Sequence, residues 1–469
     1  MSDGIADLLV RNAKLVAVCD GAGRELPGGW VAITAGVITG VGAAADPAPE
    51  AATTLDASGC LVTPGLINTH HHMYQNLTRS YGPAINGSLF SWLTVLYPLW
   101  ARIDEEAAYL SAWVGLAELA LGGCTTTTDH LYIAPRGGGD VWSAEIAAAR
   151  ELGMRFHPTR GSMTVSVKDG GLAPDSVVQD DDDVLADSER LVKLHHDPSF
   201  CSMVQVALAP CALFTVSPAL MRRTAELAEK LDVRLHTHLA EDPDEDTYCL
   251  EQYGRRPVEQ FEEVGWLTSR AWVAHCLYPS PAEVTRLGAA GVGVAHCPSS
   301  NMLIGGGGFA PVRELRAAGA PVGLGCDGSA CTDSASLWIE SRAALLLGRQ
   351  RLGPGGMTAR EVLDIATRGS AACLGRTGEI GELSVGAAGD LVCWPQEGVR
   401  YAGALIDPVE AWLRCGPVSA RHTVVAGKVL VRDGELTVPG ADIEDRLRRH
   451  AAASARVQGL ASGGSGQRR

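Results

Sequence analysis

The apolar positions between Asp7 and Leu61 form short runs separated by turn signals such as D-G, G-G and A-G. Short apolar runs between turn residues are typical of β-strands. No helical period of any length is visible before residue 100. We therefore expect a small region built of strands alone, with runs at Leu8–Val10, Leu15–Val18, Trp30–Ile33 and Val37–Ile38.

The pattern changes at Pro64, where strands begin to alternate with helices. The expected strands are Leu61–Asn68, Thr125–Asp129, Arg155–Thr159, Ser202–Ala209, Arg234–His238, Ala271–His275, Gly293–His296 and Val322–Cys326. The expected helices are Glu105–Leu121, Val141–Leu152, Asp183–His195, Pro218–Leu231, Pro281–Ala290 and Val312–Ala318. Eight strands with helices in most gaps predict an α/β fold of the (β/α)8 barrel type. A doubly wound open sheet is the alternative.

After a last helix at Thr358–Leu374, the chain returns to short strands at Leu391–Trp394 and His422–Val431. Because both ends of the chain have this character, we expect them to pair into one discontinuous, sandwich-like β-domain. The predicted division is 1–63 and 376–440 for the β-domain and 64–375 for the barrel. Residues 441–469 are predicted to form a terminal helix (Glu444–Gln458) and a flexible tail (Ala461–Arg469).

Composition narrows the class of protein. Hydrophobic residues make up 46% and charged residues 20% of the 469 residues, which is typical of a globular protein. A net charge of −15 argues against nucleic acid or an anionic membrane as the partner. No apolar run is long enough to span a bilayer, and the N-terminus lacks a signal-peptide pattern. The 13 cysteines form no C-x-x-C pair and indicate reduced thiols, so we expect a cytoplasmic protein.

The chemically richest stretch is Pro64–Gln75, P-G-L-I-N-T-H-H-H-M-Y-Q, where an apolar strand runs into three histidines. Side chains on a strand alternate between faces, so His70 and His72 are expected to point the same way and His71 to point away. Two imidazoles at one strand end supply half of a metal site. The alternative is an ordinary pair of polar residues at the end of a strand.

Other expected strands end in similar residues. They contribute His236, His238 and Glu241, then His275, then Asp327. Each has a structural alternative: a hydrogen-bonded boundary histidine, an Asp-Gly turn, or a carboxylate at a helix N-terminus. Barrels gather functional groups at the C-terminal ends of their strands, so we expect these side chains to meet. Histidine nitrogens with one carboxylate form a ligand set for Zn²⁺ or Fe²⁺ that leaves a position for water.

The ordered motifs P-G-L-I-N-T-H-H-H, H-L-A-E, A-H-C and G-L-G-C-D-G-S resemble the amidohydrolase superfamily, in particular its mononuclear deaminase and chlorohydrolase branch. The resemblance covers nearly the whole chain. It implies a metal held by His70, His72, His238 and Asp327. It also implies that Glu241 is the proton shuttle and that His275 lies close to the metal. No lysine ends the Ser202–Ala209 strand, where binuclear relatives carry a carbamylated one, which favours a single ion, zinc or alternatively iron.

The resemblance also implies a reaction. Metal-activated hydroxide attacks a ring carbon that carries an exocyclic amine, as in zinc nucleobase deaminases. Glu241 protonates the neighbouring ring nitrogen, Asp327 takes up a proton from the water, and His275 stabilises the developing oxygen charge. Enzymes of this branch are often homo-oligomers, so a homo-oligomer is expected.

The substrate class follows from departures within the branch. Cys211, in A-P-C-A-L-F-T-V-S, occupies the place where adenosine-type members carry a histidine. This segment, with N-T-H-H-H-M-Y-Q-N-L-T-R and H-P-T-R-G-S-M, resembles the enzymes that convert 8-oxoguanine to urate and ammonia. Gln75, Arg160 and Cys211 are then candidate substrate contacts, although a strand-end glutamine, an ion-paired arginine and an inert thiol are equally ordinary. Triazine hydrolases, guanine or pterin deaminases and a non-catalytic binding relative are the alternatives.

Overall fold

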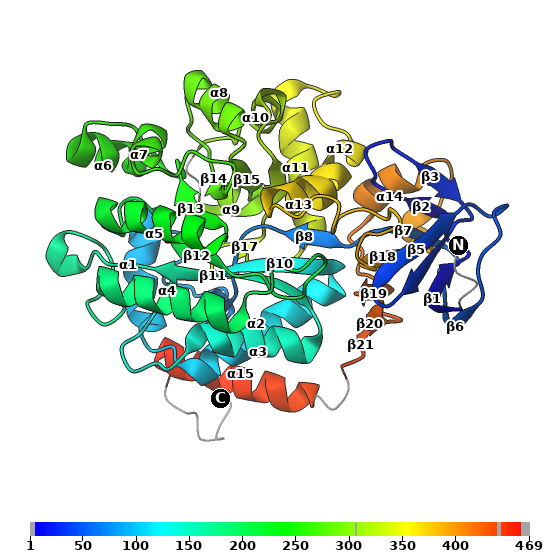
Figure 1. Cartoon of the computed structure of the whole chain (residues 1–469), viewed down its shortest axis with the longest axis horizontal. Helices are drawn as coiled ribbons and strands as arrows, with labels where there is room; N and C mark the ends of the chain where they lie inside the picture. Colours follow the sequence, from blue (N-terminus) through cyan, green and yellow to red (C-terminus); the bar gives the residue numbers. More distant parts are fainter. Residues whose placement is uncertain (1–4, 305–306, 439–441, 461–469) are drawn as a thin grey trace, which may run out of the picture.

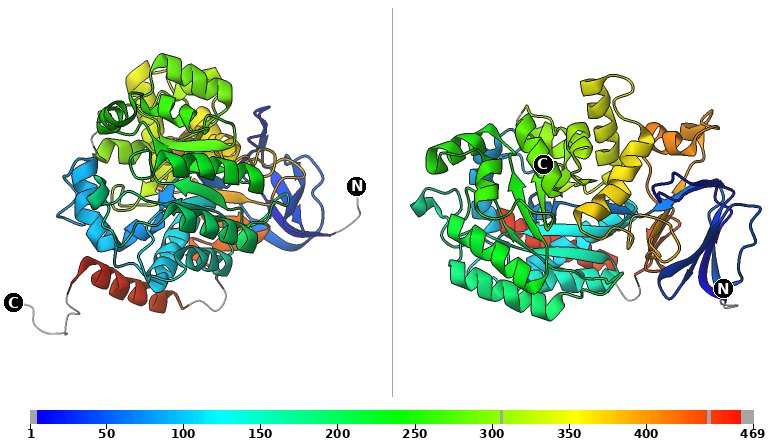
Figure 2. Two further views of the ribbon diagram at one scale, coloured as in Figure 1. Left: turned by 60° about the vertical axis from the view of Figure 1, so that its left-hand side comes forward. Right: turned by 45° about the horizontal axis from the view of Figure 1, so that its top comes forward.

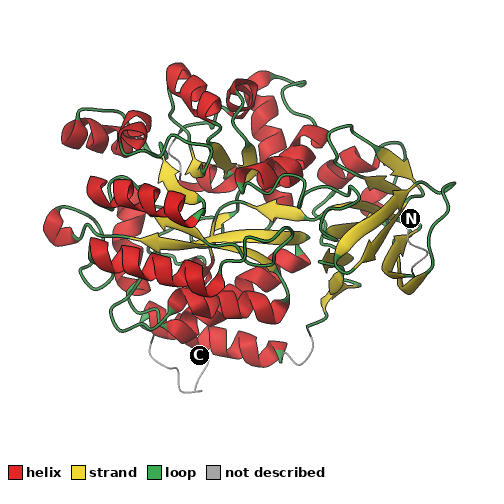
Figure 3. Cartoon of the chain, in the orientation of Figure 1, coloured by secondary structure: helices red, strands yellow, loops and turns green. Residues whose placement is uncertain are grey.

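The computed structural model describes residues 5–304, 307–438 and 442–460. The predicted tail Ala461–Arg469 lies outside these ranges. The strands of a barrel occupy the centre of the larger part of the molecule, and helices surround them (Figure 3). A smaller β-domain stands at one end of the barrel (Figures 1 and 2).

The barrel is a closed ring of eight parallel strands in the order β10-β11-β12-β13-β14-β15-β16-β8. The ring closes where β16 pairs with β8, with Leu324 opposite Asn68. This closure confirms the (β/α)8 prediction and excludes the open sheet. The strands are β8 (Leu66–Asn68), β10 (Cys124–Leu131), β11 (Arg155–Ser162), β12 (Ala207–Pro210), β13 (Leu235–Leu239), β14 (Ala271–His275), β15 (Gly293–His296) and β16 (Val322–Leu324).

Most of the surrounding helices begin at a residue whose side chain accepts a backbone N–H, as Asp104, Ser217 and Ser280 do. The helices are α2 (Glu105–Leu121), α3 (Val141–Leu152), α4 (Asp181–His195), α5 (Pro218–Leu231), α6 (Pro243–Tyr253), α7 (Pro257–Glu263), α8 (Pro281–Ala290), α9 (Pro298–Ile304), α10 (Val312–Ala318) and α11 (Leu337–Leu352). The predicted last helix is α12 (Ala359–Asp364) and α13 (Ser370–Cys373), joined by a π-helical turn at Ile365–Gly369.

The expectation that no helix precedes residue 100 was wrong. Helix α1 spans Leu89–Trp100, and a 3-10 turn, η1, spans Met73–Thr78. The sequence of α1, L-F-S-W-L-T-V-L-Y-P-L-W, has few polar residues and contains Pro98, so it shows no clear polar face. Tertiary packing overrides this weak local signal, because most of its side chains are buried against the rest of the barrel.

Two predicted strands also differ from the structure. The expected strand Leu61–Asn68 divides into β7 (Cys60–Pro64), which belongs to the β-domain, and β8. The division falls at Gly65, where a Cβ would lie 1.9 Å from Thr125 Oγ1, so only glycine fits. The expected strand Ser202–Ala209 is shorter and shifted, because only β12 joins the barrel there.

The β-domain contains two sheets that draw on both ends of the chain. A four-stranded sheet runs β5-β4-β1-β6, and a seven-stranded sheet runs β21-β20-β19-β18-β7-β2-β3. The strands are β1 (Ala6–Arg11), β2 (Leu15–Ala17), β3 (Glu25–Pro27), β4 (Trp30–Thr34), β5 (Val37–Gly42), β6 (Ala51–Asp56), β18 (Leu391–Pro395), β19 (His422–Val425), β20 (Lys428–Arg432) and β21 (Glu435–Leu436). Pairing of β18 with β7 confirms the discontinuous domain. One helix, α14 (Pro408–Cys415), lies between β18 and β19 in the chain.

The terminal helix α15 (Ile443–Gln458) packs back along the barrel against α2 and η1 (Figure 1). His450 Nε2 lies 2.7 Å from Asn76 Oδ1. Ser454 and Gln458 both donate to the carbonyl of Leu77. The predicted helix at the end of the chain is therefore present, and it contacts the turn that directly follows the three histidines.

The thirteen cysteines are all unpaired in the described structure, as the reduced-thiol prediction requires. Within the same residues, no helix has the length and apolarity needed to cross a membrane.

Candidate active site

Four histidines and an aspartate from different strand ends meet at the C-terminal end of the barrel. His70 follows β8, His72 ends the short strand β9 (His71–His72), His238 lies on β13 and His275 ends β14, while Asp327 begins β17 (Asp327–Gly328). His72 Nε2 lies 3.2 Å from His238 Nε2. Asp327 Oδ1 lies 3.3 Å from the Nε2 atoms of both His70 and His72. The structure thus brings together residues that the sequence separates by more than 250 positions.

The hydrogen bonds behind these rings set their tautomers. His72 Nδ1 donates to the carbonyl of His130 at 2.7 Å, and His238 Nδ1 donates to the carbonyl of Cys211 at 2.7 Å. A carbonyl can only accept, so the proton of each neutral ring is on Nδ1 and its Nε2 carries a lone pair. Burial lowers the pKa of both histidines, which keeps the rings neutral.

These tautomers suit the cluster to bind a divalent metal ion. The Nε2 lone pairs of His72 and His238 face each other and the carboxylate of Asp327. Without a cation between them, these electron-rich atoms repel one another. His70 Nε2 is fully buried and has no hydrogen-bond partner among the described residues. Three imidazole nitrogens and a carboxylate oxygen are the donor types that Zn²⁺ and Fe²⁺ prefer. The residues therefore fit such an ion.

Glu241 and His275 stand next to this cluster. His275 Nδ1 donates to Asn301 Oδ1 at 2.9 Å, and its Nε2 faces Glu241. Burial raises the pKa of Glu241 to about 7, and Asp327 adds to the effect while His275 opposes it. Burial lowers the pKa of His275, but Glu241 and Asp327 outweigh it and the net shift is upward. Glu241 is therefore able to take up and release a proton near neutral pH, and His275 faces it.

The backbone is strained where these side chains leave their strands. Ala240, His275 and Asp327 have φ values of 51°, 69° and 59°, in the left-handed region that non-glycine residues rarely adopt. Such strain persists only where surrounding contacts impose it, and it gathers at functional sites. Here the left-handed conformation turns the backbone sharply after each strand, close to the polar side chains of the cluster.

His71 points away from the cluster, as the strand alternation predicted. Its Nδ1 donates to the carbonyl of Asp327 at 2.5 Å, and His71 pairs with Asp327 in the β9–β17 ladder. His71 therefore holds the backbone of Asp327.

A cavity opens beside the cluster. Its wall contains His72, Gln75, Leu89, Trp92, Leu93, Tyr97, Tyr132, Cys211, Ala212, Phe214, His238, Glu241, His275, Ile304 and Asp327. Gln75 and Cys211, two of the three predicted substrate contacts, are among these residues. Gln75 Oε1 is buried without a hydrogen-bond partner in the described structure. Gly328 makes room for it, since a Cβ there would lie 1.8 Å from Oε1.

Arg160, the third predicted contact, does not reach this cavity. It lies three residues after His157 on β11, and strand alternation turns it outward to the helix layer. Its Nε donates to Asp187 at 2.9 Å, and its guanidinium lies 4.0 Å from the ring of Trp142. The ordinary alternative, a buried ion-paired arginine, describes what the structure shows.

Several residues of the site were missed from the sequence. His130, at the end of β10, lies with His70, His72 and His238 in one group of possible ligands. Its position after the run T-T-T-T-D could have been found by the strand-end rule that found the others. Tyr132 lies just beyond that strand, and Tyr97 lies on α1, the helix that the pattern did not reveal.

Comparison with known proteins places the chain among hydrolases. The model of the amidohydrolase family matches residues 61–430. The chain is 46% identical to the 8-oxoguanine deaminase of Pseudomonas aeruginosa, over 95% of this chain and 98% of that one. It is 36% identical to the hydroxydechloroatrazine ethylaminohydrolase of Pseudomonas sp. strain ADP, over 93% and 88%. The crystal structure of atrazine chlorohydrolase TrzN from Arthrobacter aurescens TC1 complexed with zinc superposes with a TM-score of 0.89 at 33% identity, covering 95% and 100%.

Proposed function

Since this chain belongs to the amidohydrolase family and is a hydrolytic deaminase, we propose that it converts 8-oxoguanine and water to urate and ammonia. The observation that carries the proposal is the cavity, in which Glu241, His275 and Gln75, whose Oε1 has no hydrogen-bond partner among the described residues, meet apolar walls. A planar base with oxo groups and ring nitrogens offers partners for these groups. The 46% identity to an enzyme named for this substrate supports the choice.

We propose a single zinc ion, with iron as the alternative, and His70, His72, His238 and Asp327 as its ligands. When bound, such an ion lowers the pKa of water toward 7 and acts as a Lewis acid. The carbonyls of His130 and Cys211 orient two of the imidazoles toward it. The zinc complex of the superposed chlorohydrolase supports the choice of metal.

The protons are handled by side chains of this chain. Glu241, with its pKa raised to about 7, holds a proton and gives it to a ring nitrogen of the base. Asp327 accepts a proton from the attacking water. His275, whose Nδ1 donates to Asn301, takes part with both ring nitrogens protonated, so that Nε2 donates to the oxygen on which negative charge develops. Asp327 passes the proton it accepted to the amino group, which leaves as ammonia. The remaining proton of the new hydroxyl returns to Glu241 as the carbonyl forms.

The lining of the cavity supports a flat ring, because apolar and aromatic side chains surround a few polar groups. Apolar side chains of α1, Leu89, Trp92 and Leu93, form one part of the wall, and Phe214 and Ile304 contribute further apolar surface. Tyr97 and Tyr132 add phenol groups that are able to donate or accept hydrogen bonds.

A second candidate is hydrolysis of a hydroxylated s-triazine, which the 36% identity to an ethylaminohydrolase favours. Guanine and pterin deamination use the same catalytic groups.

The test of the proposed function is ammonia release by the zinc-loaded protein from 8-oxoguanine, guanine, isoxanthopterin, cytosine and hydroxyatrazine. We expect the highest kcat/KM for 8-oxoguanine, with urate as product. Turnover of another ring with 8-oxoguanine inert would overturn the assignment. Size-exclusion chromatography tests the predicted homo-oligomer.

A further inference from the structure

Behind His70 lies another histidine, which has no role in the reaction above. His236, on β13, is fully buried, and its Nε2 lies 2.8 Å from His70 Nδ1. Its own Nδ1 donates to the carbonyl of Trp272 at 2.9 Å. That carbonyl fixes the proton of His236 on Nδ1 and leaves Nε2 as an acceptor. His70 must therefore donate from Nδ1, and its Nε2 is left with a lone pair.

Trp272 holds His236 in place. Its ring stacks on His236 with centroids 4.4 Å apart and an angle of 18° between the planes. Its indole Nε1 donates to the carbonyl of Thr69 at 2.9 Å. Thr69 directly precedes His70. Trp272 therefore contacts both His236 and the backbone next to His70. These hydrogen bonds and the ring contact connect three barrel strands, β8, β13 and β14.

His70 differs in this respect from the other two histidines proposed as ligands. His72 and His238 donate to backbone carbonyls, which no substitution removes. His70 alone of the three depends on a side chain for its acceptor. Its tautomer and ring orientation are therefore set by a residue that can be changed.

We propose that His236, held by Trp272, is a positioning residue that keeps the proton of His70 on Nδ1 and directs Nε2 at the metal. The inference rests on the proposed metal site and requires no particular substrate. Without the acceptor, His70 Nδ1 loses its partner in a dry barrel interior, and the ring is free to turn or to carry its proton on Nε2. Loss of such a partner typically weakens metal binding by about 10–100-fold.

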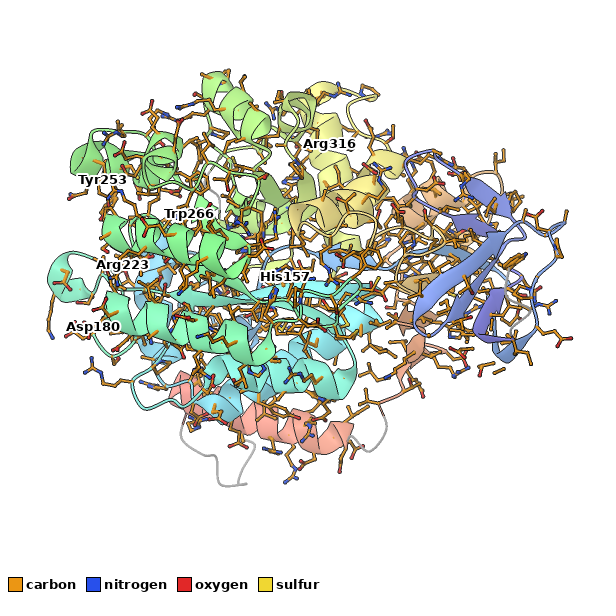
Figure 4. All side chains as sticks on the ribbon, in the orientation of Figure 1. His157, Asp180, Arg223, Tyr253, Trp266 and Arg316 are labelled. Atoms are coloured by element: carbon orange, nitrogen blue, oxygen red, sulfur yellow. The ribbon has the colours of Figure 1, made fainter. Side chains whose placement is uncertain are left out.

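The barrel offers a matched control in His157 of β11, which lies among the barrel strands (Figure 4). It is as deeply buried as His236 and packs edge-on against the same Trp272, with centroids 5.6 Å apart. Neither of its ring nitrogens has a hydrogen-bond partner among the described residues. A change at His157 therefore repeats the packing disturbance without removing an acceptor of His70.

The test compares His236→Met with His236→Gln, two unbranched replacements of which only glutamine offers a strong acceptor. The full-length metal-free proteins are titrated with Zn²⁺ against a chelating indicator, and the Co²⁺-loaded forms are compared by visible absorption. We expect His236→Met to bind Zn²⁺ about 10–100-fold more weakly and to show an altered Co²⁺ spectrum. His236→Gln and His157→Met should stay within a few-fold of the wild type.

Equal affinities for the Met and Gln variants at position 236 would overturn the inference, as would equal losses in His157→Met and His236→Met. If His236→Met does not fold, His236→Gln decides: a loss as large as that of Asp327→Ala would contradict the acceptor role. A wild-type protein that binds no zinc would instead refute the proposed metal site.

Discussion

Glu241 Oε1 lies 3.5 Å from His275 Nε2, so a carboxyl group and an imidazole face each other at the edge of the histidine cluster. Only 12% of the Glu241 side chain is exposed, and burial raises its pKa to about 7. A carboxyl with that pKa is able to give up and regain its proton in each catalytic cycle. This contact underlies the first prediction.

Glu241→Gln should keep its metal and lose activity. The amide has the same shape but cannot move a proton, so we expect kcat to fall by about 10²–10⁴-fold with the zinc content unchanged. Steady-state kinetics and metal analysis of one preparation measure both. Glu251→Gln, at an exposed position of α6, is the control. Activity near that of the wild type would remove the shuttle role.

Removal of the metal should abolish activity, and the choice of ion should decide its return. Three nitrogen donors suit Zn²⁺ or Fe²⁺, whereas Mg²⁺ prefers oxygen ligands. Dialysis against a chelator followed by addition of each ion, with ammonia release as the readout, tests this. Recovery with Mg²⁺ but not with Zn²⁺ would contradict the proposed ligand set. Asp327→Ala should not recover with zinc.

Gln75 and Arg160 should respond differently to substitution. Gln75→Leu removes the side-chain amide of Gln75 from the cavity wall. We expect kcat/KM for the substrate to fall by about 10-fold, the equivalent of one hydrogen bond. Arg160→Met breaks the contact with Asp187 and should lower the free energy of unfolding by about 1.5–3 kcal/mol without changing KM. Urea unfolding and steady-state kinetics separate the two effects. A raised KM in Arg160→Met would return that residue to the substrate site.

A buried pair of carboxyl groups lies behind the three histidines. Asp129 and Glu145 are fully buried and lie next to each other, and Asp129 Oδ1 accepts the N–H of Met73 at 2.6 Å. Burial raises the pKa of Asp129 to about 7, and burial together with the neighbouring Asp129 raises the pKa of Glu145 well above its usual range. The pair therefore retains protons that the unfolded chain releases. Stability from this source is present at low pH and is lost as pH rises from about 4 through about 7.

Glu145→Gln should flatten this dependence. The glutamine amide donates to the Asp129 carboxylate and favours its charged form, which lowers the pKa of Asp129. Urea unfolding of the metal-free proteins at several pH values should show a wild-type curve that falls relative to that of the variant, by at most about 1.4 kcal/mol per pH unit for each proton. Glu226→Gln, at an exposed position on α5, should follow the wild type. If the free energy of unfolding changed with pH in the same way for the wild type and Glu145→Gln, the pair would not be the source of this pH dependence.

The histidine and aspartate cluster could be predicted from the sequence because the barrel topology largely decides where these side chains lie. Once His70, His238, His275 and Asp327 are assigned to strand ends, closure of the barrel brings those ends to one face. The same reasoning fails for Arg160, because a strand also decides by alternation which side chains face inward, and a one-residue error in register sends a side chain to the other face.

Other parts of the site depend on contacts that no local pattern contains. Helix α1 exposes Ser91, Thr94, Val95 and Pro98 along one side, and none of these residues is charged, so the sequence shows no strongly polar face to reveal its period. His236 was visible as a strand-end histidine, but its role depends on Trp272, which is 36 residues later in the chain. The carbonyls that orient His72 and His238 belong to His130 and Cys211, and side-chain chemistry cannot reveal a backbone acceptor.

The position of α15 couples a distant part of the chain to the proposed metal site. The turn η1, which carries Asn76 and Leu77 directly after the proposed ligand His72, is secured by His450, Ser454 and Gln458. These partners are separated by more than 370 residues in the sequence. A substitution in α15 that removes these contacts therefore acts on the segment that carries His72, although α15 itself supplies no proposed ligand.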